Sequence, residues 1–187
     1  MSENRLILVT GGARSGKSIY AEKLAREQGE KVVYLATAAA LDSEMKERIK
    51  AHQAARPSSW LTLEETLKVV ETLRKIPPDT EVVLLDCLTL WISNLMLEKA
   101  GPREPSGEEV KFLEEELIQE GKRLVEELGE RNQTVIVVSN ELGLGVVPEF
   151  VLGRIFRDVV GKANQMLAQA ADEVYFLISS IPMKIKG

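Results

Sequence analysis

A glycine-rich run near the N-terminus has the residue types and spacing of a phosphate-binding loop. It fits Gly-x-x-x-x-Gly-Lys-Ser and consists of Gly11, Gly12, Ala13, Arg14, Ser15, Gly16, Lys17 and Ser18. Glycines let successive backbone N–H groups turn toward one anion, and a following helix adds the positive end of its dipole. In such a loop Lys17 reaches the β- and γ-phosphates as a catalytic residue, and the Ser18 hydroxyl is a ligand for Mg²⁺. The alternative is a chance Gly-Lys-Ser in a turn, and the strand-like run before it and the helical pattern after it weigh against that.

A carboxylate at the end of a second apolar run is the next candidate for phosphate chemistry. Asp86 follows Val-Val-Leu-Leu at residues 82–85. Phosphate-loop enzymes carry an acidic residue at such a strand end, where it holds Mg²⁺ directly or through water. The alternative is a strand end that faces solvent. We favour a metal site formed by Ser18 and Asp86.

The single histidine, His52, has two interpretations. In a helix it shares a face with Ile49 and Arg56, so it can be a core-facing side chain with one hydrogen-bonded nitrogen. It can also be a nucleophile, because imidazole has a pKa of about 6.5 and is largely neutral near pH 7. Arg56, one turn further on, can then neutralise phosphate oxygens. Attack of the ring nitrogen on an α-phosphorus would release pyrophosphate and leave a nucleotidyl-histidine.

Two further segments carry weaker patterns. Glu64 can contact a sugar hydroxyl or a base edge, or it can face solvent beside Glu65. The run Asn-Glu-Leu-Gly-Leu-Gly-Val-Val-Pro at residues 140–148 can receive a second substrate, or it can be a turn with demanding backbone angles.

Strand and helix patterns alternate along the chain and must position these residues. Apolar runs predict strands at residues 6–10, 31–36, 81–85, 134–139 and 173–178. Helical patterns predict helices from the phosphate loop to residue 29 and over residues 42–55, 63–75, 88–97, 108–128 and 149–171, the last with a break at Gly161. Ile19, Leu24 and Ala25 are expected to face the core, and residues 88–97 to form a buried helix or an oligomer contact. The fold class is therefore α/β, a mostly parallel sheet covered by helices on both faces, with ligands at the carboxyl ends of the strands.

Composition narrows the class of protein. The length of 187 residues predicts a single domain over residues 1–187, and 44% hydrophobic and 28% charged residues are ordinary for a soluble globular protein. A net charge of −5 without a separate basic cluster disfavours nucleic acid and anionic membranes as partners. The longest apolar run is too short to span a bilayer, the N-terminus enters a strand directly, and Cys87 is the only cysteine. We therefore expect a cytoplasmic protein without a signal peptide or a membrane span.

Six blocks of residues form an ordered pattern along the chain. They are the phosphate loop, Ala36-Thr37-Ala38, the pattern from Arg48 through His52 and Arg56-Pro57 to Glu64, Asp86-Cys87-Leu88-Thr89, the run at residues 140–148, and Met183-Lys184-Ile185-Lys186. Together they resemble the bifunctional adenosylcobinamide kinase and adenosylcobinamide-phosphate guanylyltransferase family. The likeness spans essentially the whole chain. Ala38 stands where the family commonly has a serine, so a hydroxyl contact is lost there.

The resemblance implies a RecA-like phosphate-loop (P-loop) NTPase fold, a homotrimer and two reactions. First, ATP or GTP phosphorylates the hydroxyl of the aminopropanol arm of adenosylcobinamide, a corrinoid. GMP from GTP then passes through a guanylylated His52 to that phosphate, giving adenosylcobinamide-GDP in cobalamin biosynthesis. The residues implied to contact the guanine nucleotide are residues 11–18, Ala36, Thr37, Ala38, Gln53, Ala54, Ala55, Arg56, Glu64 and Asp86.

Two other functions use the same residues differently. A small-molecule kinase would need only the phosphate loop and would leave His52 structural, so no acid-labile protein adduct would form. A nucleotide-switched binding module would bind GTP tightly and hydrolyse it slowly, and corrinoids would not affect its activity.

Overall fold

The structure is a computed structural model that describes residues 5–39, 56–101 and 104–187. Its elements in chain order are β1 (Leu6–Gly11), α1 (Lys17–Gln28), β2 (Val32–Ala36), β3 (Leu61–Glu64), α3 (Val69–Leu73), β4 (Val82–Asp86), α4 (Leu88–Ala100), α5 (Glu108–Gly129), β5 (Thr134–Val138), α6 (Val151–Ala170), β6 (Glu173–Ile178) and β7 (Ile181–Lys186). The helix predicted over residues 42–55 lies outside the described residues.

One seven-stranded sheet organises the molecule, in the order β3-β2-β4-β5-β1-β6-β7. The first six strands in this order, β3, β2, β4, β5, β1 and β6, run parallel to one another. The last strand, β7, is antiparallel to β6. The phosphate-loop strand β1 is separated from β4, which ends in Asp86, by β5.

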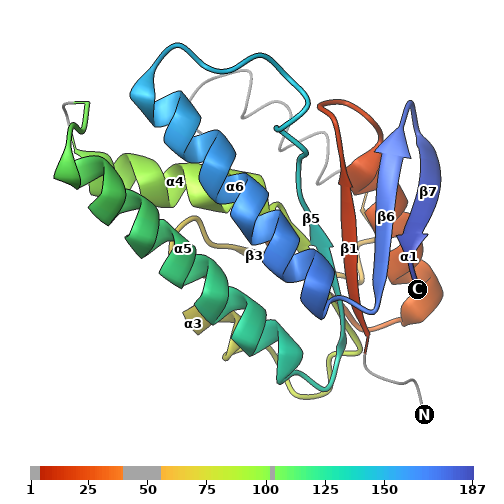
Figure 1. Ribbon diagram of the computed structural model, residues 1–187. Helices are drawn as coiled ribbons and strands as arrows, with labels where there is room; N and C mark the ends of the chain where they lie inside the picture. Colours follow the sequence, from red (N-terminus) through yellow and green to blue (C-terminus); the bar gives the residue numbers. More distant parts are fainter. Residues whose placement is uncertain (1–4, 40–55, 102–103) are drawn as a thin grey trace.

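Both faces of the sheet are buried because successive side chains of each strand point to opposite sides. In β1, Ile7 and Val9 pack with α1, whereas Leu6 and Leu8 pack with the cluster formed by α3, α4, α5 and α6. Figure 1 shows α5 and α6 on one side of the sheet and α1 on the other. The predicted α/β class, with a mostly parallel sheet covered on both faces, is confirmed.

The helix predicted over residues 63–75 is wrong in its first half. Residues 61–64 form the edge strand β3, and a turn then leads to the short helix α3. The Glu65 carboxylate accepts hydrogen bonds from the N–H groups of Leu67 and Lys68 at 2.8 and 2.9 Å. This local side-chain capping favours a turn over a continuous helix.

Three smaller expectations also differ from the structure. The Ile19 side chain is 72% exposed and does not face the core, whereas Leu24 and Ala25 are buried as predicted. Helix α6 continues through Gly161 without a break. Helix α4 buries Trp91 and Ile92 within the subunit and extends to residue 100, so the buried-helix interpretation of this segment holds.

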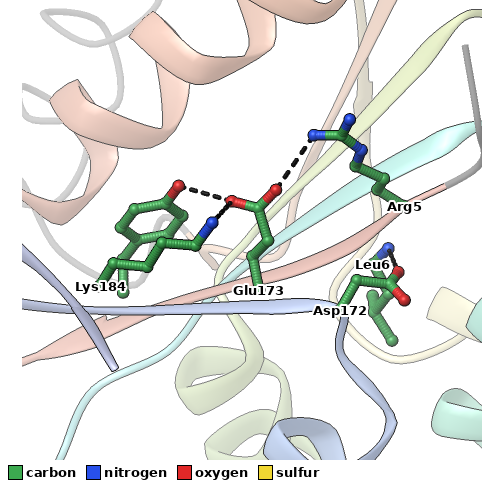
Figure 2. Close-up of polar contacts among 6 residues, drawn as sticks. Arg5, Leu6, Asp172, Glu173 and Lys184 are labelled. Carbon is green, nitrogen blue, oxygen red and sulfur yellow. Dashed lines mark hydrogen bonds and ion pairs between the residues drawn. The ribbon is translucent and has the colours of Figure 1, made fainter. Parts of the chain in front are cut away.

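Strand β7 was absent from the sequence prediction and extends the sheet beyond β6. Ser179 and Ser180 connect the two strands with φ values of 50° and 66°, the left-handed backbone of a tight hairpin turn. At the opposite end of the hairpin, Figure 2 shows the Glu173 carboxylate between Arg5 and Lys184, with an ion pair of 3.1 Å to each. These contacts fix β6 and β7 against β1.

The described helices include none that is both long and apolar enough to cross a membrane.

Candidate nucleotide site

Strand register brings the predicted site residues to one edge of the sheet. Ala36 at the end of β2 pairs with Glu64 on β3 and with Asp86 on β4, and Asp86 pairs with Val138 on β5. Strand β1, beside β5, runs directly into the phosphate loop. Candidate groups from the ends of four parallel strands therefore line a single edge, where α/β sheets bind ligands.

The phosphate loop has the backbone that its sequence predicts. Gly11, Arg14 and Gly16 have φ values of 145°, 55° and 90°, and α1 begins at Lys17. The Lys17 ammonium donates a hydrogen bond to the Gly12 carbonyl at 2.5 Å. Burial lowers the pKa of Lys17, and the neighbouring Cys87 and Asp86 oppose this shift. The loop therefore combines positive backbone φ angles, a helix N-terminus and one buried amine.

The β6–β7 turn packs directly against this loop. The Ser180 N–H donates to the Ser15 carbonyl at 2.9 Å. A Cβ atom added at Gly16 would lie 2.6 Å from Ser180 Oγ, and one at Gly11 would lie 2.5 Å from the Leu177 carbonyl oxygen. Two loop glycines are thus required by close approach as well as by backbone angle. Sequence reasoning missed this support because the turn lacks glycine and asparagine.

Asp86 is connected to Arg56 through Tyr34. The Tyr34 hydroxyl donates to Asp86 Oδ2 at 2.6 Å. The Arg56 guanidinium stacks 3.3 Å above the centre of the Tyr34 ring, and its Nε lies 3.7 Å from a Glu22 carboxylate oxygen. Burial raises the pKa of Tyr34, with the Asp86 carboxylate adding to the shift, so the phenol keeps its proton. Arg56 is itself buried at this edge, which nothing in its local sequence indicates.

Thr37 fixes the spacing between the ends of β2 and β4. Its hydroxyl donates to the Cys87 carbonyl at 2.7 Å and accepts from the Cys87 N–H at 2.8 Å. Its own N–H donates to the Asp86 carbonyl, and its carbonyl accepts from Asn94. Thr37 is fully buried, so its side chain acts on the position of the Asp86 segment.

The loop after β5 is anchored by polar side chains from two helices. The Asn140 N–H donates to Thr89 Oγ1 at 2.8 Å, and the Asn140 carbonyl accepts from Asn164 Nδ2 at 2.9 Å. Ser139 donates to Asn164 Oδ1 at 2.6 Å. Beyond this anchor the loop exposes apolar side chains, with Val146 94% exposed.

Ser18 and Asp86 provide a donor set that suits Mg²⁺. Magnesium prefers hard oxygen ligands and, in phosphate sites, takes few of them from the protein. Ser18 lies in the first turn of α1, and among the described residues no hydrogen bond engages Asp86 Oδ1, since Tyr34 bonds Oδ2. The described part of the chain has no group of three or more histidine, cysteine or acidic side chains placed to hold a metal by themselves. The residues therefore fit a metal that phosphate oxygens and water help to coordinate.

Of the candidate residues predicted from sequence, some fall outside the described ranges. Residues 11–18, Ala36, Thr37, Ala38, Arg56, Glu64 and Asp86 are described, whereas His52, Gln53, Ala54 and Ala55 are not.

Cys87 is buried, and burial raises the pKa of its thiol to about 12. It is therefore a structural residue and not a nucleophile.

The loop between β1 and α1, together with the strand order, defines a P-loop nucleotide-binding protein of the RecA-like class. A solved DnaB-like replicative helicase matches with a TM-score of 0.50 and 15% identity, over 92% of this chain and 46% of that chain. A structure from Pyrococcus horikoshii matches with a TM-score of 0.52 and 11% identity, over 100% of this chain and 88% of that chain. These likenesses concern the fold alone.

The chain belongs to the cobinamide kinase / cobinamide phosphate guanyltransferase family, which matches residues 7–185. The bifunctional adenosylcobalamin biosynthesis protein CobU of Escherichia coli is 41% identical over 97% of this chain and 99% of that protein. The bifunctional adenosylcobalamin biosynthesis protein CobP of Pseudomonas aeruginosa is 44% identical over 96% of each chain. The family is one of bifunctional enzymes that combine a kinase with a nucleotidyltransferase.

Proposed function

We propose that this protein phosphorylates adenosylcobinamide with ATP or GTP and then transfers GMP from GTP to adenosylcobinamide phosphate, giving adenosylcobinamide-GDP in cobalamin biosynthesis. The observation that carries the proposal is the meeting of the phosphate loop, Lys17 and Asp86 at one sheet edge in a member of this family. A kinase alone would need no more than this edge. The second reaction adds a nucleophile, for which His52 is our candidate.

In the kinase step the loop N–H groups and Lys17 bind the β- and γ-phosphates. The acceptor hydroxyl oxygen attacks the γ-phosphorus, the bond to the bridging oxygen breaks, and the nucleoside diphosphate leaves with that electron pair. The hydroxyl proton passes to solvent. Mg²⁺, held by Ser18 and Asp86, would neutralise charge on the phosphate oxygens. The Tyr34 hydroxyl, which donates to Asp86 at 2.6 Å, orients the carboxylate for this role.

In the transfer step a neutral His52 nitrogen attacks the α-phosphorus of GTP, and pyrophosphate leaves. The phosphate oxygen of the corrinoid then attacks the same phosphorus and releases His52, so the guanylyl group is transferred without net change to the protein. Arg56 follows the segment that carries His52, and its buried guanidinium stacks on Tyr34. We propose that Arg56 also contacts the guanine nucleotide.

The remaining nucleotide contacts are also proposals. Main-chain groups of Ala36 and Ala38, the segment Gln53-Ala54-Ala55 and the Glu64 carboxylate would recognise the guanine nucleotide, with Thr37 acting as a positioning residue. We further propose that residues 1–187 work as one domain, in a cytoplasmic homotrimer. The exposed apolar side chains of the loop after β5 give such an assembly a surface to cover.

Separation of corrinoid products tests the proposal. Wild-type protein with cobinamide, ATP, GTP and Mg²⁺ should yield a phosphorylated corrinoid first and a GDP-linked corrinoid second, identified by mass. His52→Ala should still make the first product and none of the second. A wild-type protein that stops at the phosphorylated product is a simple kinase, and one that binds GTP but makes neither product is a binding module.

A further inference from the structure

A groove of about 540 Å³ lies between α6 and the β1-β6-β7 part of the sheet. Leu8, Val174, Phe176 and Ile185 give it an apolar floor, and Gly161 lies in its helical wall. The β6–β7 hairpin extends the sheet past α6, as Figure 1 shows. None of the described residues proposed to bind the nucleotide or the metal lines this groove.

One end of the groove opens at the phosphate loop. Thr10 lines the groove and immediately precedes Gly11. Glu141 and Gly143, from the loop after β5, line the same end, and the Glu141 N–H donates to the Gly11 carbonyl at 3.0 Å. A molecule in the groove therefore ends beside the phosphates of a bound nucleotide.

The polar groups of the groove suit an uncharged ligand that carries hydrogen-bonding groups. Arg157 and Lys162 are balanced by Asp158 and Glu141, and Arg157 is already paired with Asp158 at 2.8 Å. Gln165 of α6 also lines the groove and is exposed, so its neutral amide can donate and accept hydrogen bonds there. A second nucleotide, with several negative charges, fits this balance of charge poorly.

We propose that this groove binds an edge of the corrinoid acceptor, an apolar macrocycle that carries neutral amide side chains. The ring edge packs on the Val174–Phe176 floor, an amide pairs with Gln165, and the hydroxyl arm extends past Glu141 to the phosphate loop. This inference rests on the proposed function, because it supplies the acceptor site which that function requires.

A substitution that fills the groove provides the sharpest test. A Cβ added at Gly161 meets no atom within 4 Å, so the side chain of Gly161→Leu starts in open space at the groove. The change also raises helix propensity, which protects the fold. Gly161→Ala adds one methyl group as a graded variant. Lys122→Leu puts the same side chain on the exposed surface of α5 and is the matched control.

Equilibrium dialysis with cobinamide as the probe, and with GTP in a parallel cell, gives the result. Gly161→Leu should weaken cobinamide binding by at least about tenfold and Gly161→Ala by less. Lys122→Leu should bind cobinamide as the wild type does, and all the proteins should bind GTP equally. Gln165→Leu, which removes the side-chain amide, should weaken cobinamide binding by about threefold to tenfold.

The outcomes separate this inference from the proposed function. Wild-type binding of cobinamide by a folded Gly161→Leu protein would overturn the groove as the acceptor site and leave the proposed function standing. A change in oligomeric mass of Gly161→Leu with unchanged cobinamide binding would mean that another copy covers the groove, which also overturns the inference. If the wild type neither binds nor phosphorylates cobinamide, the proposed function itself fails.

Discussion

The contact between Gly16 and Ser180 gives the most specific prediction about the phosphate loop. Gly16 has φ +90°, and an added Cβ would lie 2.6 Å from Ser180 Oγ and 3.1 Å from Ser180 Cβ. A Gly16→Ala protein therefore meets a backbone cost of about 1–3 kcal/mol and an overpacking cost of about 1–3 kcal/mol. We expect its free energy of unfolding to fall by about 2–6 kcal/mol in total.

Ser180→Gly separates the two costs. It removes both of these Ser180 side-chain atoms and suits the φ of 66° at this position, so alone it should change stability by no more than about 1 kcal/mol. In the Ser180→Gly background, Gly16→Ala should cost only its backbone part. The double-mutant cycle should then give a coupling of about 1–3 kcal/mol.

Urea unfolding of the four proteins, followed by tryptophan fluorescence and by circular dichroism, measures the cycle. Coincident transitions by the two probes justify the two-state free energies. A Gly16→Ala cost that is the same in both backgrounds, within about 0.5 kcal/mol, would refute the claim that the β6–β7 turn packs against the loop.

Three further predictions concern single groups. Thr37→Val removes both hydrogen bonds to Cys87 and should lower the free energy of unfolding in urea by about 2–3 kcal/mol. The control Thr62→Val, at an exposed position of the edge strand β3, should change it little. Equal losses in the two variants would contradict the role of Thr37. The hydrogen bond from the Tyr175 hydroxyl lowers the pKa of Glu173, so this carboxylate stabilises the fold above its unfolded pKa near 4.5 and loses that effect as the pH falls below it. Glu173→Gln should thus be less stable than wild type by about 1 kcal/mol near pH 7, with a gap that closes on acidification, and a gap independent of pH would contradict this. Burial lowers the pKa of Lys17 from the ordinary lysine value of 10.5. ATP affinity, measured by titration at increasing pH, should therefore begin to fall at a pH below that expected for an ordinary lysine. An ATP affinity that stays constant up to pH 10.5 would contradict a buried Lys17 amine.

The strands and the phosphate loop could be predicted because their information is local. Residues 82–85 are continuously apolar, and a parallel strand buried on both faces needs that pattern. The last two residues of the edge strand β3 fall within the predicted helix over residues 63–75, because Leu63, Leu67 and Val70 recur at helical spacing. Pairing of Leu63 with Leu35 of β2, which only the fold supplies, overrides that local preference.

The parts that sequence reasoning missed depend on contacts between distant residues. The β6–β7 turn consists of two serines at positive φ, without the glycine or asparagine that marks such turns. Tyr34 is an apolar strand residue by pattern, and its hydrogen bond to Asp86 spans 52 residues of chain. Asn164 occupies a buried position of α6, and its partners Ser139 and Asn140 are known only once α6 is docked.

Labelling of the protein by GTP shows whether His52 becomes guanylylated. Folded wild-type protein is incubated with Mg²⁺ and GTP labelled at the α- or the γ-phosphate, without corrinoid. A guanylylated His52 should give an acid-labile, alkali-stable protein label from the α-position only, and a His52→Ala protein that still binds GTP should carry no such label. Equal α-labelling of His52→Ala, or no label on a wild-type protein that binds GTP and Mg²⁺, would contradict it.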